Sequence, residues 1–426
     1  MEMMIGKLYY RLNQRHDFLV FLITRVFGLL LRPLIIFLAS LIGQSQFAID
    51  YALLTTALAS LFVLTGAQIH IQYYKLRFDE QNRTGYSYAF RDYFRDSLTH
   101  LVIVLPLVAV VAFLWTNDSL IIGLLTMHVV IEKFFDEDQR HHLFTRQYLR
   151  WSASFAARTV IPGIVIVTAM HFISGRIIIY YSLISILSFA SYLLIKKRYT
   201  KFYAKICVSI WHEFRHGAAS MISRFLKRWR NEYSFNQLWS FLSVNFYLLD
   251  RLWVANQEGL RLDVYVFFAT LFNMIVVGHS ILYFTPRRPE LIKTQGKMIM
   301  SEWLRLPNLM LPFLLAACAI VAAIFAKTIN PEYEAMFSVS LIAGMAAFFI
   351  IQASILVVIE TVFWRVSRKQ LLKVDIFALV FILSTFALSE PAAQYLPWVM
   401  ICGALIRLVG YISLAHFLPI RGSNNI

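Results

Sequence analysis

Long apolar stretches alternate with short polar segments along almost the whole chain. Each stretch has about 16–28 residues, which is enough for one helix to cross the hydrocarbon core of a bilayer. The pattern therefore predicts an all-α integral membrane protein with about twelve spanning helices. The expected spans are 17–42, 50–72, 98–115, 119–135, 151–173, 177–195, 235–254, 263–285, 309–328, 334–361, 374–389 and 394–417.

The composition supports this prediction. Of 426 residues, 59% are hydrophobic and 15% are charged, whereas soluble domains have about 45–50% apolar and 25% charged residues. The segment before Asp17 is polar and basic, and the first apolar stretch is too long for the core of a cleavable signal peptide. The net charge of +16 could suggest nucleic acid as a partner, but membrane topology explains it, so no nucleic-acid partner is expected.

The basic residues are distributed very unevenly between the predicted loops. The N-terminal tail, the even-numbered loops and the C-terminal tail together hold 32 of the 40 Lys and Arg residues. The odd-numbered loops hold only Arg176, Arg261 and Lys327. Because Lys and Arg are retained on the cytoplasmic side, both termini are expected in the cytoplasm, with the protein in the cytoplasmic (inner) membrane.

The longest predicted loop lies in the middle of the chain and divides it into three parts. These are an N-terminal six-helix bundle over 1–196, a cytoplasmic linker over 197–234 and a C-terminal six-helix bundle over 235–426. Apolar residues recur every three or four positions in the linker, which predicts an amphipathic helix on the inner leaflet. They are Ile206, Ile210, Phe214, Ala218, Ile222, Phe225 and Trp229.

The two bundles could be parallel repeats, because each contains an even number of helices. A short sequence match supports this idea. Val129-Val130-Ile131-Glu132 closes the fourth span, and Val357-Val358-Ile359-Glu360 closes the tenth. The two segments occupy equivalent places in the two halves.

Motifs of common enzyme classes are scarce. The chain has no P-loop, no GxGxxG and no serine nucleophile elbow, so an enzyme is not expected. His141-His142 follows Asp136-Glu137-Asp138, and a solvated loop is favoured there over a metal cluster. His128 lies in a predicted span, where a packed side chain is favoured over a proton relay. The prediction is therefore no catalytic residue, no metal and no cofactor, with the coupling ion, H⁺ or Na⁺, left open.

Charged residues inside the predicted spans are the candidate site residues. Four arginines are expected to bind an anionic group in a central cavity: Arg25, Arg32, Arg158 and Arg407. For Arg25 and Arg158, the alternative is snorkelling to the cytosol. Asp250 and Arg251, in the outer part of the seventh span, are expected to line the cavity or to form a structural ion pair. Leaving aside the acids at the ends of the spans, such as Glu132 and Glu360, five Arg and a single acid, Asp250, lie inside them, so the cavity should favour phosphate.

One stretch of sequence resembles a known family. Asn245 to Val254 reads NFYLLDRLWV, and after a short loop Tyr265 to Ala269 reads YVFFA. This is similar to the start of the second half in polysaccharide flippases, where an Asp-Arg pair ends one helix and Gly-x-Tyr opens the next. Here Asp263 stands where that Gly would be.

Together with the six-plus-six topology, this stretch resembles the Wzx-like flippases of the multidrug/oligosaccharidyl-lipid/polysaccharide exporter (MOP) superfamily, whose drug-exporting branch is the MATE family. The resemblance implies two six-helix bundles around a central cavity. It also implies that alternating access carries undecaprenyl-diphosphate-linked oligosaccharide, such as O-antigen units, to the outer leaflet for surface polysaccharide biosynthesis. Expected partners are the lipid-linked oligosaccharide, membrane lipids, a polysaccharide polymerase and glycosyltransferases.

Three alternatives remain open at the level of the sequence. A multidrug exporter of the same superfamily often relies on an acidic residue in its first helix, whereas this first span contains Arg25 and Arg32. A polysaccharide polymerase or ligase usually carries a large outer loop, and the outer loops here are short. A structural scaffold does not explain arginine inside the spans.

Overall fold

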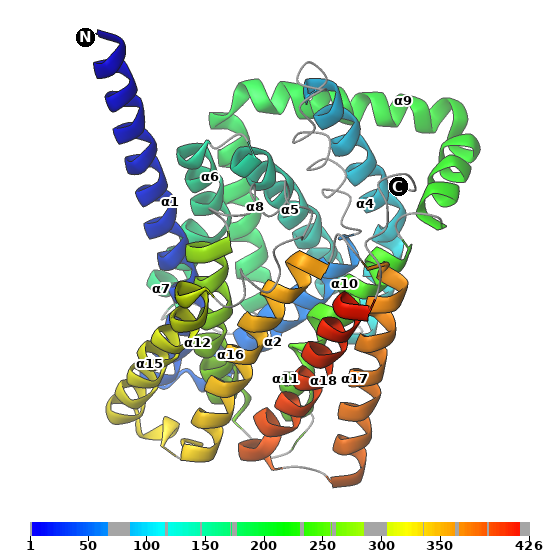
Figure 1. The fold of residues 1–426 in the computed structure, drawn as a ribbon. Coiled ribbons are helices and arrows are strands. Elements are labelled where there is room, and N and C mark those ends of the chain that lie inside the picture. Colours follow the sequence, from blue (N-terminus) through cyan, green and yellow to red (C-terminus); the bar gives the residue numbers. More distant parts are fainter. Residues whose placement is uncertain are drawn as a thin grey trace. The chain divides into compact units, whose positions relative to one another are not determined.

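A computed structural model describes most of the chain, and the elements of its described residues are helical (Figure 1). It describes residues 2–66, 86–115, 118–144, 147–170, 172, 177–230, 234–255, 257, 261–284, 305–334, 336–362, 366–389 and 392–417. The first elements are α1 (Glu2–Leu41), α2 (Ser45–Leu64), α4 (Tyr86–Trp115), α5 (Ser119–Phe144), α6 (Tyr148–Phe155), η2 (Ala156–Val160), α7 (Ile161–Ala169), α8 (Ile177–Ile195) and α9 (Lys197–Arg228). The later elements are α10 (Ser234–Phe246), α11 (Leu249–Ala255), α12 (Leu262–His279), η4 (Ser280–Phe284), α15 (Leu306–Ile329), η5 (Pro331–Tyr333), α16 (Val339–Val362), α17 (Arg368–Ser389), η6 (Ala393–Tyr395) and α18 (Leu396–Phe417).

Ten helical segments in the described residues are long and apolar enough to cross a membrane. They are His16–Leu41, Ser45–Leu64, Tyr93–Phe113, Tyr148–Ala169, Ile177–Ile195, Leu262–Phe284, Leu306–Ile329, Val339–Ile359, Arg368–Ser389 and Leu396–Leu414. Each corresponds to one of the spans expected from the sequence. The fold class is therefore all-α, and these helices indicate a multi-pass membrane protein.

Two expected spans are not among these ten segments. The span expected over 235–254 is divided at Tyr247 and Leu248 into α10 and α11. The Asn245 side chain donates a hydrogen bond of 2.9 Å to the carbonyl oxygen of Phe241, and such bonds compete with the regular backbone pattern. The span expected over 119–135 lies within α5, whose second half carries many charged residues.

The prediction of a solvated loop over 136–142 was wrong. These residues continue α5, and Asp138 and His142 are buried. The helix continues past its apolar stretch because oppositely charged side chains four residues apart lie on one face, as Lys133 and Glu137 do at 2.6 Å.

Two compact units make up the chain. Unit 1 contains residues 1–65 and 98–216, and unit 2 contains residues 66–97 and 217–426. In unit 1, α1 packs against α2, α6 and α7, while α5 packs against α2, α6 and α8. In unit 2, α12, α15, α16, α17 and α18 run roughly side by side (Figure 1), and α18 packs closely on α16 and α17. The division into bundles over 1–196 and 235–426 stays a prediction.

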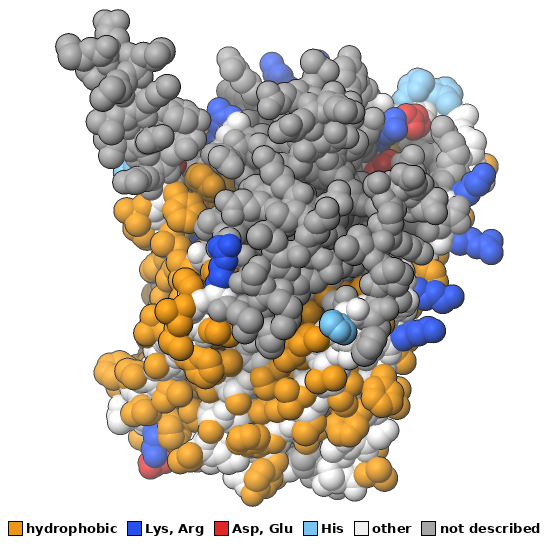
Figure 2. Space-filling view, in the orientation of Figure 1, with side chains coloured by type: hydrophobic (Ala, Val, Ile, Leu, Met, Phe, Trp, Pro, Cys, Tyr) orange, Lys and Arg blue, Asp and Glu red, His pale blue; other side chains and the backbone are white. Residues whose placement is uncertain are grey.

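The surface of the described residues is rich in apolar side chains. On the face drawn in Figure 2, hydrophobic side chains make up much of the described surface. Large ones such as Leu187, Leu314 and Leu388 are strongly exposed on helices that are long enough to span a bilayer. Exposed apolar side chains on such helices are suited to contact with lipid.

The central linker forms a helix, as expected. α9 covers Lys197–Arg228, and its backbone departs from helical geometry at Gly217, where unit 1 gives way to unit 2. The expected lipid-facing stripe was wrong for Ile206, Ile210 and Phe225, since all three are buried within the protein. Because α9 packs against its own chain, these apolar side chains face the protein rather than the lipid.

Candidate functional site

The two arginines of the first span lie on one face of α1. At 100° per residue, positions seven apart differ by only about 20° around a helix. The same face carries the buried side chains of Phe21, Ile35 and Ala39.

An exposed apolar stripe of α1 lies on the opposite side of the helix. Ile23, Phe27 and Leu34 are exposed and follow one another at helical spacing. Helical geometry puts Arg32 about 160° away from this stripe. Although Arg32 is exposed, it therefore faces the other helices of unit 1 rather than the stripe.

Two buried tyrosines interact electrostatically with Arg32. Its guanidinium lies within electrostatic range of the hydroxyl groups of Tyr51 on α2 and Tyr181 on α8. The two tyrosine rings are 5.9 Å apart. Arg32 makes no ion pair with any residue that the structure describes. Arg25 differs, because its guanidinium carbon lies 5.3 Å from the centre of the Trp151 ring, a cation–π contact.

A second polar group lies close to Tyr181. The ring of His128 is 5.2 Å from that of Tyr181, and its Nε2 is 3.5 Å from Oε1 of Glu132, one turn further along α5. Tyr181 is also within electrostatic range of Glu132 and Arg158. Tyr181 therefore connects Arg32 with the ion pair that Arg158 forms.

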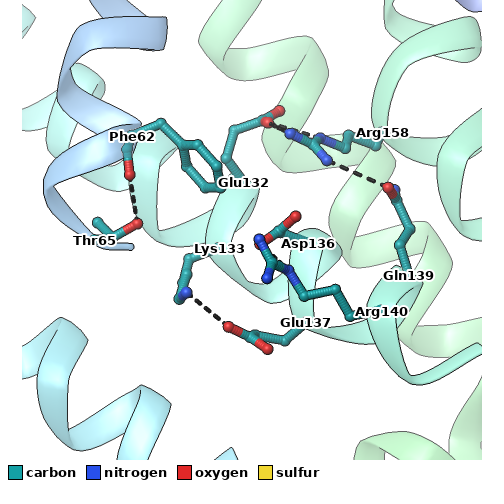
Figure 3. A network of polar contacts seen from close by, with 9 residues as sticks. All are labelled: Phe62, Thr65, Glu132, Lys133, Asp136, Glu137, Gln139, Arg140 and Arg158. Atoms are coloured by element: carbon teal, nitrogen blue, oxygen red, sulfur yellow. Dashed lines mark hydrogen bonds and ion pairs between the residues drawn. The ribbon is translucent and has the colours of Figure 1, made fainter. Parts of the chain in front are cut away.

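Arg158 has a carboxylate partner (Figure 3). Its Nε donates to Oε2 of Glu132 at 2.7 Å, and its Nη1 donates to Oε1 of Gln139 at 3.3 Å. The side chains of Arg158 and Glu132 are 19% and 15% exposed. The guanidinium also lies 5.8 Å from the ring centre of Phe62. This ion pair is therefore partly accessible to solvent.

The backbone around Arg158 is a short π-helix. The N–H of Ile161 donates to the carbonyl oxygen of Ala156, five residues earlier. Pro162 has no N–H to offer the Arg158 carbonyl, so regular α-helical bonding is interrupted there. The Ser188 hydroxyl of α8 donates to the carbonyl oxygen of Ala157. Such bulges often occur at functional sites, and this one holds Arg158 against α5.

Further charged pairs continue along α5 (Figure 3). Arg140 Nε donates to Oδ2 of Asp136 at 2.7 Å. On another face, Asp138 accepts hydrogen bonds from the hydroxyls of Tyr192 at 2.5 Å and Tyr203 at 3.0 Å. Burial raises the pKa of the Asp138 carboxyl, but His142 and Tyr192 outweigh this effect and hold the pKa below its usual range.

Arg407 lies in unit 2 and is completely buried. Its side chain is 0% exposed, that of Asp375 is 2% exposed, and Nε of Arg407 is 3.0 Å from Oδ1 of Asp375. Its Nη2 donates to the Ser243 hydroxyl at 2.6 Å. The ring of Phe246, next to the break between α10 and α11, lies 4.6 Å from the guanidinium carbon. α10, α17 and α18 together enclose this arginine.

Asp250 is also buried, and it connects two parts of the stretch that resembles the flippases. Its carboxylate accepts hydrogen bonds of 2.8 Å from the Tyr265 hydroxyl and from the backbone N–H of Arg251. Asp263 pairs with Arg261 at 2.8 Å, and Arg261 also reaches Glu332 at 3.0 Å. The cavity and ion-pair hypotheses for Asp250 and Arg251 both stay predictions.

The structure groups some of the predicted site residues and separates others. Arg25, Arg32 and Arg158 belong to unit 1, whereas Arg407 and Asp250 belong to unit 2. The sequence prediction missed the residues that contact or approach these arginines. They are Tyr51, His128, Gln139, Tyr181, Ser243 and Asp375. Their pairing depends on contacts between helices, which a linear pattern does not contain.

The expectation that the chain contains no H-E-x-x-H motif was wrong, because α9 carries one. His212-Glu213-Phe214-Arg215-His216 has the H-E-x-x-H spacing found in zinc peptidases. The two imidazole rings are 4.3 Å apart. Zinc peptidases use three protein ligands, and within the described residues no group of three His, Cys, Asp or Glu side chains could hold a metal ion.

The unit 1 cluster offers a defined set of chemical groups: an exposed guanidinium, two hydroxyls, an imidazole and a partly exposed ion pair. Hydroxyl and guanidinium groups donate hydrogen bonds to anionic oxygens.

Comparisons of the chain with protein-family models, with curated proteins and with solved structures find no match.

Proposed function

We propose that this protein is a Wzx-like flippase that moves a diphosphate-linked oligosaccharide lipid across the cytoplasmic membrane. Arg32 is the observation that carries the proposal. It is an exposed arginine in an apolar helix, it faces the helices of its own unit, and it has no ion-pair partner among the described residues. Because arginine inside a membrane span is costly, such a residue is best explained by an anionic ligand.

The surroundings of Arg32 suit a diphosphate. The Tyr51 and Tyr181 hydroxyls can donate to phosphate oxygens beside the guanidinium fork. Arg25 lies seven residues earlier on the same face, about 10 Å away along the helix axis. Two moderate sites in sequence would let the headgroup be bound and then released, as transport requires.

The other two arginines receive different roles in this proposal. Arg158 shares its charge with Glu132 and is partly exposed, so it contributes to the electrostatic field of the site. Arg407 is enclosed and paired with Asp375, so we assign it to stabilising unit 2. Within this proposal, two six-helix bundles surround a central cavity and alternate in access.

The contact between Asp250 and Tyr265 also supports the proposal. Both residues belong to the stretch that resembles the flippases, and this hydrogen bond joins its two parts. Where Gly would be expected, Asp263 forms an ion pair with Arg261, so its charge is compensated locally.

The proposal is tested on Arg32 in cells that depend on this protein for surface glycan. Arg32→Ala should reduce surface glycan at normal protein levels, Arg32→Lys should restore part of it, and Arg32→Glu should be worst, because it repels the diphosphate. Arg150→Glu is the matched control, since Arg150 is an exposed arginine of the same unit that bonds Gln147. Normal glycan export by Arg32→Glu would contradict the proposed mechanism.

The orientation of the chain is tested separately. Cytoplasmic termini and a cytoplasmic α9 predict that a cysteine at the exposed Lys201 is labelled only from the cytoplasmic side. Arg287, the second position suited to this test, lies outside the described residues. Labelling of either position from the outside would disprove the topology.

A further inference from the structure

The first half of α9 has three distinct faces. Lys197 follows α8 after a single residue, and Figure 1 shows α9 lying across the end of α8 rather than alongside it. The segment 197–216 belongs to unit 1. Its position at the end of a membrane-spanning helix puts it at the level of the lipid headgroups.

The first face packs against unit 1. Tyr203, Ile206 and Ile210 are buried and lie within about 60° of one another around the helix. The Tyr203 hydroxyl donates to Oδ1 of Asp138 at 3.0 Å, and its ring lies 6.4 Å from that of Phe134. This face fixes how the helix is rotated about its own axis.

The second face is apolar but exposed. Val208 and Trp211 are each 66% exposed, and Phe214 is 37% exposed. The rings of Trp211 and Phe214 stack at 6.3 Å. Cys207 is exposed beside them. This face is turned about 100° away from the packed face. In water, a tryptophan and a phenylalanine held exposed side by side would be unfavourable.

The third face is basic. Arg215 and Lys201 are exposed and lie about 40° and 80° beyond Trp211, on either side of Val208, whereas the exposed Lys205 lies on the opposite side of the helix from Phe214. Residues 197–216 contain five Lys and Arg residues and a single acid, Glu213. Basic side chains that border an exposed apolar face are typical of helices that lie on anionic membranes.

We propose that α9 binds the anionic lipids of the leaflet next to the end of α8, with Cys207, Val208, Trp211 and Phe214 inserted between headgroups. Lys201 and Arg215 then contact lipid phosphates from the bordering face, and Lys205 lies on the far side of the helix. The packed face explains why insertion uses these side chains and not Ile206 or Ile210. This surface is independent of the transported substrate, so it goes beyond the proposed function.

The full-length chain provides its own reporter for a test. Replacing Cys318 and Cys402 with Ser leaves Cys207 on the apolar face, where it can carry an environment-sensitive fluorophore. The matched control carries Lys205→Cys together with Cys207→Ser, which moves the same label to the far side of the helix. Both proteins are placed in nanodiscs of phosphatidylcholine and phosphatidylglycerol. Fluorescence quenching is then measured with a spin-labelled lipid and, separately, with aqueous iodide.

If the apolar face is inserted, spin-labelled lipids should quench the fluorophore at position 207 at least ~3-fold more strongly than the fluorophore at position 205. Aqueous iodide should quench the fluorophore at position 205 more strongly. Spin-labelled phosphatidylglycerol should quench position 207 more than spin-labelled phosphatidylcholine does. This preference should disappear when Lys201→Glu and Arg215→Glu are combined. Equal quenching of the two positions would mean that the apolar face binds another protein or remains in water. Equal quenching by the two lipids would overturn the preference for anionic lipid.

Discussion

The arginine clusters of the two units differ in accessibility and in pairing. In unit 2, Arg407 is fully buried, and Asp375 and Ser243 hold its guanidinium. In unit 1, Arg32 is exposed within electrostatic range of two tyrosines, and Arg158 shares a partly exposed ion pair. A buried arginine paired with a buried carboxylate is neutral overall and attracts a ligand anion less strongly. An exposed arginine without such a partner attracts it more strongly.

This contrast changes how arginine in a membrane span should be interpreted. Counting charges within predicted spans gave an excess of Arg over acid. Asp375 and Glu132 reduce the excess, because each pairs with one of the arginines that were counted as ligand-binding. Of the four, Arg32 is the strongest candidate for binding an anion.

The largest effect on stability is expected from breaking the buried ion pair of Arg407 and Asp375 in unit 2. Asp375→Ala leaves the Arg407 guanidinium buried without its carboxylate, which should lower the free energy of unfolding by about 3–5 kcal/mol. Thermal unfolding in detergent measures the loss. The double variant Asp375→Leu with Arg407→Leu should recover most of it, because it removes both charges. A single variant as stable as the parent would contradict a structural role for this pair.

A smaller, pH-dependent effect is expected at Asp138 in unit 1. Tyr192→Phe removes a hydroxyl that bonds the carboxylate at 2.5 Å, and about 2 kcal/mol should be lost at pH 7. Because the folded-state pKa of Asp138 is lowered, its stabilising contribution exists above the ordinary Asp pKa and fades as the pH falls below about 4. Thermal unfolding of both proteins at neutral and acidic pH should show the difference shrinking in acid. A constant difference would exclude the carboxylate as its cause.

Breaking the partly exposed ion pair of Arg158 and Glu132 in unit 1 should cost less stability than breaking the buried pair of Arg407 and Asp375 in unit 2. Glu132→Gln removes the negative charge beside Arg158 but keeps an acceptor, so about 1 kcal/mol of stability should be lost. The released guanidinium should also bind inorganic pyrophosphate more tightly than the parent does, which calorimetry can measure. Unchanged affinity would show that Arg158 does not face the ligand.

The smallest effect on stability is expected at Arg32. Its replacement by Ala should change the free energy of unfolding by no more than about 0.5 kcal/mol, because no buried group loses an ion-pair partner among the described residues. Thermal unfolding beside the glycan-export assay separates a ligand-binding role from a structural one. A loss as large as that of Asp375→Ala would assign Arg32 to the structure of unit 1.

The order of residues alone determined much of this protein's architecture. Apolar stretches long enough to cross a bilayer must form helices there, because each backbone polar group needs a partner within its own segment. The periodic apolar positions of the linker over 197–234 likewise predicted a helix. These properties depend on neighbours in sequence, and ten of the expected spans and α9 have counterparts in the structure.

The tertiary structure decided which charged residues are neutralised and which face of each helix is covered. Asp375 and Arg407 are 32 residues apart, and they pair because α17 packs on α18. Ile206 and Val208 are both apolar, yet docking of Tyr203 on Asp138 buries the first and leaves the second exposed. Helix packing brings distant residues together and fixes the rotation of each helix, so accessibility and pairing are properties of the folded chain.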